Sequence, residues 1–171
     1  MRYSSSHKQE TRAKLLASSK AIAKQGGFDA TGIDALMSAI GLSGGAFYNH
    51  FPSKQALFEA LVREELESSS QMLAGDDQSD ADHVAKCLRR YLSTSHAANP
   101  ESGCALPTLG PEIARSSKDV RKAAEKSLKH THDSWSERIN DPDGAWALIA
   151  QCVGALVLAR SEIGPNRPTK R

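Results

Sequence analysis

The 171-residue chain lacks the residues that mark several classes of protein. Its three cysteines, Cys87, Cys104 and Cys152, form no CxxC pair, which argues against a disulfide framework or a zinc site. The polar N-terminus has no apolar core of the kind found in signal peptides. The most apolar run, residues 145–159, is shorter than a membrane span and is interrupted by Gln151. We therefore expect a cytoplasmic protein with no metal and no membrane partner.

Recognisable enzyme motifs are missing as well. The sequence has no glycine-rich phosphate loop, no nucleophile elbow and no HExxH pair. His130 and His132 are two residues apart, so on a helix they point in different directions and do not converge on a metal ion. We expect neither enzymatic activity nor a cofactor.

The charges that are present are unevenly distributed. The whole chain has 22 Lys and Arg against 20 Asp and Glu, a net charge of +2. Residues 1–63 alone have eight Lys and Arg against four Asp and Glu, a net charge of +4, and the remainder carries −2. A basic head on a slightly acidic body suits a protein that places one end on phosphate groups.

Apolar residues recur with helical spacing throughout the chain, and no segment alternates like a strand. The pattern predicts helices over residues 10–25, 31–40, 43–51, 53–74, 79–98, 118–139 and from 141 onward, with a short or kinked one within 103–115. Ser43, Ser53, Ser79, Ser117 and Asp141 are the expected N-caps. The helix over residues 79–98 should bury four apolar side chains, which are Val84, Leu88, Tyr91 and Leu92.

The most informative stretch is TGIDALMSAIGLSGGAFYNHFPSK, residues 31–54. Two short helices meet across the tight turn at residues 41–43, which is the arrangement of a helix-turn-helix. Gly44 and Gly45 would let the second helix approach base edges closely. The remaining polar groups suit bonds to phosphates or base edges; they belong to Tyr48, Asn49, His50 and Lys54.

These residues resemble the head of the TetR family of bacterial repressors. The resemblance rests on Thr-Arg at 11–12, Gly-Phe at 27–28, Thr31, Ile-Gly-Leu-Ser at 40–43, Gly-Ala-Phe-Tyr at 45–48, His-Phe at 50–51 and Ser-Lys at 53–54. It implies a DNA-facing surface formed by Thr31, Ser43, Gly44, Gly45, Ala46, Tyr48, His50 and Lys54, with Phe47 and Phe51 in the core of the head. Asn49 joins that surface by its own chemistry.

The resemblance also predicts how the chain is organised. We expect an all-α protein with a three-helix head over residues 1–52 and a ligand-binding, dimer-forming body over residues 53–164, of which 53–74 is a connecting helix. The polar run at residues 75–79 is a further candidate boundary, and residues 165–171 should be a disordered tail. The expected seam of a homodimer is an apolar stripe made of Leu148, Ile149, Cys152, Val153, Leu156 and Val157.

The predicted function is that of a transcriptional repressor. It would bind a palindromic operator in double-stranded DNA as a homodimer and be released by a small-molecule effector. Cys104 and Tyr91 are candidates for a sensor or for the pocket, and Cys104, near the start of a body helix, could act as a thiolate that senses oxidants or electrophiles. The alternatives are a small-molecule-binding module without DNA specificity and a purely architectural DNA-binding protein.

Overall fold

The structure, a computed structural model, describes residues 5–76, 79 and 82–161, so the predicted tail at 165–171 lies outside it. Every regular element in these ranges is helical, which confirms the all-α class. The elements, with η for 3₁₀ helices, are α1 (Ser5–Gly26), α2 (Ile33–Ser38), η1 (Gly44–Asn49), α3 (Lys54–Ala74), α4 (His83–Tyr91), α5 (Thr94–Ala98), η2 (Pro100–Ser102), α6 (Leu106–Arg115), α7 (Lys118–Ile139) and α8 (Pro142–Ser161).

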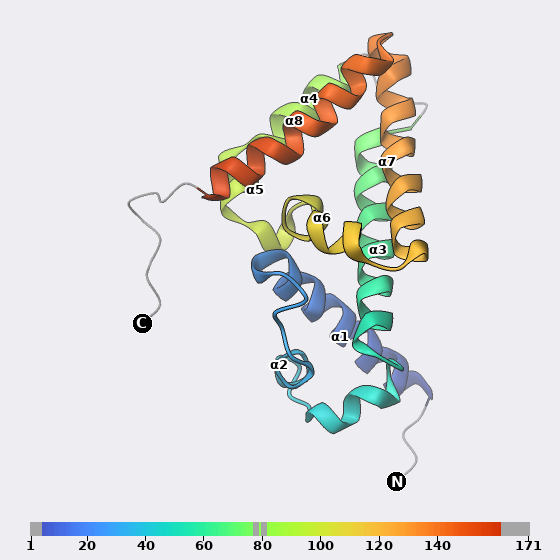
Figure 1. The fold of residues 1–171 in the computed structure, drawn as a ribbon, viewed down its shortest axis with the longest axis vertical. Helices are drawn as coiled ribbons and strands as arrows, with labels where there is room; N and C mark the ends of the chain where they lie inside the picture. Colours follow the sequence, from blue (N-terminus) through green and yellow to red (C-terminus); the bar gives the residue numbers. More distant parts are fainter. Residues whose placement is uncertain (1–4, 77–78, 80–81, 162–171) are drawn as a thin grey trace.

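Figure 1 shows a small head below a larger body. The head contains α1, α2 and η1, and α3 rises out of it to run side by side with α7. In the upper part of the body, α8 with α4 and α5 lies beside the upper ends of α3 and α7. Between the two parts lies α6, which contacts α1 below and α8 above. α6 therefore contacts both the head and the upper part of the body, and η2 also packs on α1.

Three of the predicted helix caps are confirmed. The amide of Ala56 donates to the Ser53 hydroxyl at 3.0 Å at the start of α3, and the amide of Val120 donates to Ser117 at 3.3 Å at the start of α7. At α8, Asp141 accepts the Gly144 amide at 2.9 Å. Each bond satisfies an amide that the first helical turn leaves without a partner.

Two other predicted caps are wrong. The Ser43 side chain makes no capping bond; its carbonyl accepts the Ala46 amide at 3.1 Å, and the element that follows is a 3₁₀ helix. The Ser79 hydroxyl is bonded to Asp76, and α4 begins only at His83. Neither serine side chain therefore accepts an amide from the first turn of a helix.

The predicted helix over residues 79–98 is divided into two. α4 ends at Tyr91, and Ser93 then caps α5 by accepting the amide of His96 at 3.2 Å. The break turns Leu92 outward, where it is 49% exposed, so its predicted burial is wrong. Val84 and Tyr91 are buried as expected.

Two hydrophobic clusters hold the molecule together. The lower cluster joins the head to the body, because Leu109 and Ile113 of α6 pack with the buried residues of α1, α2, η1 and α3. The upper cluster is confined to the body; its buried members are Val84, Tyr91, Cys104, Trp135, Ala145, Cys152 and Leu156. The core of the head is therefore continuous with α6.

Candidate nucleic-acid interface

The turn between α2 and η1 depends on Gly41. Its φ of +75° lies in the left-handed region that glycine adopts without steric cost. The amide of Leu42 then reaches back to the carbonyl of Met37 at 3.0 Å, which closes the end of α2. The turn brings η1 against α2, so the two short helices form one unit.

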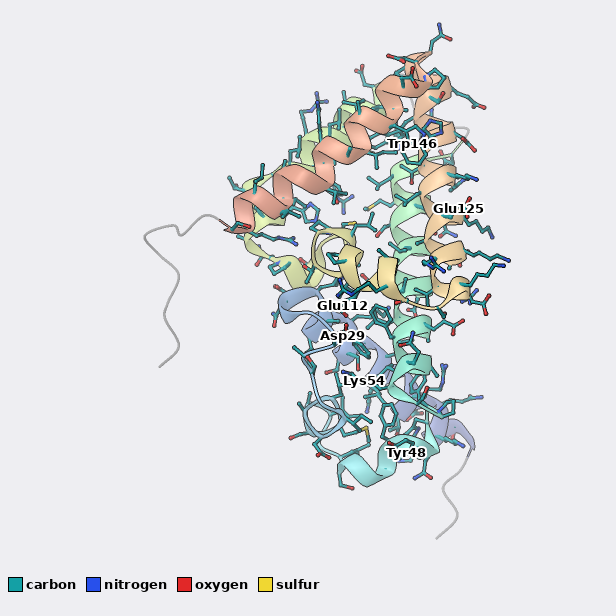
Figure 2. All side chains as sticks on the ribbon, in the orientation of Figure 1. Asp29, Tyr48, Lys54, Glu112, Glu125 and Trp146 are labelled. Carbon is teal, nitrogen blue, oxygen red and sulfur yellow. The ribbon has the colours of Figure 1, made fainter. Side chains whose placement is uncertain are left out.

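The 3₁₀ geometry of η1 separates an inner row from an outer row. Residues three apart share a row in such a helix, which pairs Gly44 with Phe47 and Gly45 with Tyr48. Phe47 is fully buried, whereas Tyr48 is 64% exposed and lies at the lower end of the head (Figure 2). The outer row therefore presents a phenol and a bare backbone to the surroundings.

The two glycines of η1 have different surroundings. A Cβ added to Gly44 would collide with the carboxylate of Asp34 in α2, so this glycine allows the two short helices to pack. A Cβ at Gly45 would meet no atom within 4 Å. No contact in the described parts of the chain requires a residue without a side chain at position 45. Close approach by an external partner would require one.

Positive charge lies beside η1. His50 is half-buried, and its pKa is lowered by burial first and then by the charge of Lys8 on α1. The guanidinium of Arg12, one turn further along α1, lies 4.4 Å above the ring of Phe51. Lys8 and Arg12 were not predicted as contact residues; their spacing of four residues, which places two cations on one face of a helix, is the signal that could have found them.

The other predicted contact residues are placed less uniformly. Lys54 donates to the carbonyl of Asp29 at 2.9 Å and lies 5.0 Å from the centre of the Phe28 ring, so it holds the turn that follows α1. Its ammonium group has three donors, which leaves capacity for a phosphate. The hydroxyl of Thr31 donates to Gly27 within the same turn at 3.2 Å. Three predicted contact residues remain. Ala46 is half-buried against the core, and Ser43 and Asn49 are exposed.

A carboxylate of the body fixes the entry to this unit. Glu112 on α6 accepts the backbone amides of Phe28 at 3.0 Å and Asp29 at 3.1 Å (Figure 2). Gly27 permits this approach, since its φ is +87° and an added Cβ would lie 2.8 Å from a Glu112 oxygen. On the neighbouring turn of α6, Thr108 donates to the carbonyl of Lys24 at 2.9 Å. The end of α1 is thus bonded to α6.

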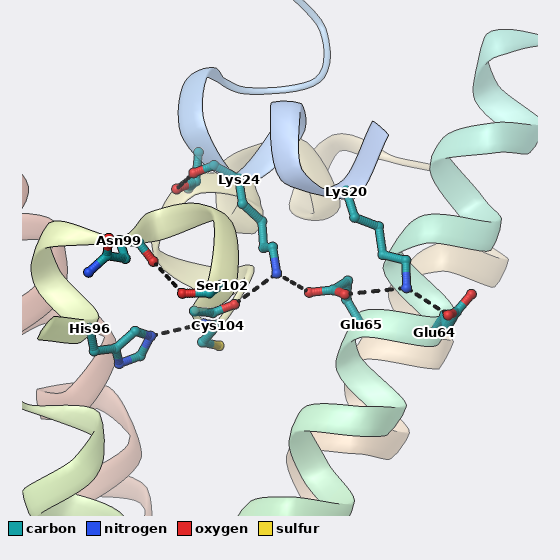
Figure 3. A network of polar contacts seen from close by, with 10 residues as sticks. Lys20, Lys24, Glu64, Glu65, His96, Asn99, Ser102 and Cys104 are labelled. Carbon is teal, nitrogen blue, oxygen red and sulfur yellow. Dashed lines mark hydrogen bonds and ion pairs between the residues drawn. The ribbon is translucent and has the colours of Figure 1, made fainter. Parts of the chain in front are cut away.

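A second connection runs through the buried ammonium of Lys24 in the last turn of α1. Figure 3 shows it between the carboxylate of Glu65 on α3, at 2.7 Å, and the carbonyl of Gly103, at 3.1 Å. The next residue, Cys104, donates its amide to His96 at 2.9 Å. A chain of polar contacts therefore joins α5, the segment before α6, α1 and α3.

Comparison with known proteins agrees with this geometry. The family described as bacterial regulatory proteins, tetR family, matches residues 15–61, which span the second half of α1, α2, η1 and the start of α3. The helix-turn-helix head therefore belongs to the TetR family. The predicted family and the helix-turn-helix head are both confirmed.

Individual TetR-family proteins are similar over most of the chain. The HTH-type transcriptional repressor NemR of Escherichia coli K12 is 26% identical over 124 residues, 70% of this chain. The match spans 62% of NemR, less than two thirds of its length. The crystal structure of E. coli NemR in its reduced form has a TM-score of 0.72 at 25% identity and covers 88% of both chains. A tetR-family regulator of Streptomyces coelicolor also has a TM-score of 0.72, at 17% identity, over 92% of this chain and 73% of that one.

In the body, some residues of the predicted dimer seam are buried in the hydrophobic core of the single chain. Cys152 and Leu156 are each 2% exposed within a single chain, because they pack in the upper cluster. They cannot form the outer surface of a seam, and this part of the prediction is corrected. Leu148, Ile149 and Val153 are half-buried. The exposed large apolar residues of α8 are Trp146 and Val157, which share one face, and Leu158, which lies about 100° further around the helix. Together these three residues form what we term the outer row of α8.

Cys104 lies two residues before α6 and is buried, beside the hydroxyl of Tyr91. The Tyr91 hydroxyl and the Leu106 amide beside it favour its thiolate, as expected near a helix start, but burial outweighs them and raises the pKa of the thiol. The predicted thiolate is therefore not favoured at this position. Both Cys104 and Tyr91 line the interior of the body, in agreement with a pocket.

Proposed function

We propose that this TetR-family protein is a cytoplasmic repressor that binds a palindromic operator as a homodimer. The observation that carries the proposal is the outer row of η1. Tyr48 is exposed there beside Gly45, a glycine that has open space around it and no internal role. Lys8 and Arg12 add positive charge next to the row, as a surface that tracks phosphates requires.

A homodimer is part of the proposal because one short helix reads only a few base pairs. The outer row of α8 is our candidate for the seam. α8 is the one described helix that is long and apolar enough to cross a membrane, yet only 22% of its most apolar window is buried within one chain. A second copy packed on Trp146, Val157 and Leu158 would cover this apolar surface.

Release from DNA is proposed to occur through a small molecule in the body. α6 is bonded to the end of α1 by Glu112 and Thr108, so a ligand that shifts α6 would shift the head. Such a shift matters because the two heads of a dimer must lie about one helical turn of DNA apart, roughly 34–36 Å or a multiple of it, for both to read the major groove. Oxidation or alkylation of Cys104 is the less favoured trigger, because burial raises the pKa of its thiol.

The test is selection of bound sequences from a random DNA pool. The proposal expects an inverted repeat with half-sites separated by about one helical turn. A module without DNA specificity, or an architectural DNA-binding protein, would return no enriched sequence, and that outcome would refute the proposal.

A further inference from the structure

A cleft of about 560 Å³ opens between α3 and the segment that carries α4 and α5. Its charged lining is dominated by cations, which are Lys24, Lys86 and Arg90. His83 and His96 line it as well. Glu65 is the one carboxylate among the described residues that form its wall. This balance of charges favours an anionic occupant.

Behind the cleft lies a smaller apolar cavity of about 40 Å³. Trp135 and Leu66 are among the side chains around it, and Tyr91, Cys104 and Leu73 line both spaces. The cavity therefore adjoins the cleft across these residues. A ligand that touches both must have a polar end and a small apolar tip.

Tyr91 lines both spaces. The residue is only 6% exposed, and within the described chain its hydroxyl oxygen has no hydrogen-bond partner, although the Cys104 thiol lies beside it. Burial raises the pKa of this hydroxyl, so it keeps its proton and can donate. A buried donor without an acceptor is unfavourable, and a ligand oxygen placed at the border would satisfy it.

We propose that the cleft binds an amphiphilic carboxylate. The carboxylate would lie in the cleft, where it accepts from Tyr91 and pairs with Arg90. The apolar chain would lie along Met72 and Leu73, with only its tip in the small cavity beside Trp135. This inference rests on the proposed function, since it names the chemical class of the effector.

The same cleft provides a route to the head. Lys24 lines it and belongs to α1, and its ammonium is held by Glu65 and Gly103 (Figure 3). A bound carboxylate competes with Glu65 for this cation. Entry of the ligand therefore weakens the bond between α1 and α3, and the end of α1 leads directly into the DNA-facing unit.

The test is isothermal titration calorimetry of the full chain without DNA. The probes are decanoate and 4-phenylbutanoate. Decanol is the uncharged control ligand, and acetate is the control carboxylate without an apolar chain. We expect both amphiphilic carboxylates to bind at least about tenfold more tightly than decanol, and acetate to bind negligibly, because a charge-assisted hydrogen bond is the difference. Equal binding of decanol, or no binding of either carboxylate, overturns the inference.

Two variants with opposite expected effects sharpen the test. Arg90→Gln should weaken decanoate by about tenfold and leave decanol within about twofold. Glu65→Gln removes the competing carboxylate and should tighten decanoate. Lys129→Gln, an exposed cation on α7 away from the cleft, is the matched control and should change neither. An Arg90→Gln variant that binds decanoate as wild type does would overturn the assignment.

The proposed effector class and the proposed DNA binding can fail separately. If the carboxylates bind but random-pool selection returns no sequence, the cleft is assigned correctly and the DNA-binding proposal fails. If an operator is found but no carboxylate binds, the effector class is wrong and the proposed function stands.

Discussion

The carboxylate of Glu112 accepts the backbone amide of Phe28 at 3.0 Å, across 84 positions of sequence. One residue belongs to α6 in the body and the other to the turn that follows α1 in the head. The bond, with a second one to Asp29 at 3.1 Å, fixes the direction in which the chain enters α2. The position of the unit formed by α2 and η1 therefore depends on the position of α6.

Replacement of Glu112 by Gln tests this dependence. A neutral amide accepts fewer and weaker hydrogen bonds than a carboxylate, so the free energy of unfolding should fall by about 1–3 kcal/mol. The measurement is urea denaturation followed by circular dichroism. Glu125→Gln is the control, since Glu125 forms only an exposed pair with Lys129 and its loss should cost little. Equal stability of the two variants would show that Glu112 does not hold the turn.

The two glycines of η1 predict different losses. Gly45→Leu should leave thermal stability close to wild type, because the site is open, and should abolish DNA binding by blocking close approach of the helix. Gly44→Ala displaces only the exposed carboxylate of Asp34, so it should change stability by no more than about 1 kcal/mol and weaken DNA binding less than Gly45→Leu does. Thermal unfolding and fluorescence anisotropy with a selected operator separate the two effects. If Gly45→Leu bound DNA normally, the outer row of η1 would not be the reading surface.

The seam is tested by a charge placed on the outer row of α8. Leu158 is 69% exposed in one chain, so Leu158→Glu should change monomer stability by no more than about 0.5 kcal/mol. In a dimer that packs this row, the same carboxylate is buried without a partner, and the dimer should dissociate. Sedimentation velocity reports the change directly. A dimer that persists in Leu158→Glu would move the seam to another face.

His96 predicts a loss of stability in mild acid. Its Nε2 accepts the Cys104 amide and its Nδ1 lies 2.7 Å from the Tyr91 carbonyl, a pattern that requires the neutral ring with the proton on Nδ1. Burial, and then the charges of Arg160, Arg90 and Lys24, lower its pKa from the usual 6.5.

The sign of the effect follows from proton binding. The unfolded chain binds a proton near pH 6.5 and the folded chain does so only at lower pH, so the stabilisation is complete above pH 6.5 and is lost as the pH falls below it. Urea denaturation between pH 5 and 8 should show this decline. His96→Gln should show a shallower decline, because the contribution of His96 is removed. Some decline should remain, because the pKa of His50 is lowered as well. An unchanged pH profile in His96→Gln would assign the decline to other groups.

Local patterns predicted much of the fold. Ser53, Ser117 and Asp141 each precede a helix whose first turn needs an acceptor, and the sequence nearby shows both the cap and the apolar periodicity. The sequence around Ser79 also resembles a helix start, but Ser79 bonds Asp76 in a turn. The choice between the two roles depends on backbone angles set by packing, which the local sequence does not contain.

The candidate site was predicted where it follows a motif and missed where it depends on distant contacts. Tyr48 and Gly45 lie within one short pattern, and the structure exposes both. The bond from Glu112 to Phe28 joins segments that no local spacing relates. Leu156 shows the same limit, since apolar periodicity marks a buried face without saying whether its partner is the same chain or a second copy.

The most direct test of the account is the stoichiometry of the complex with a selected operator, measured by native mass spectrometry. Two copies of the chain should bind one inverted-repeat duplex, and a duplex with a single half-site should bind far more weakly, because each head contributes only part of the contact. A single copy bound with full affinity to one half-site would contradict the proposal that paired heads read the DNA.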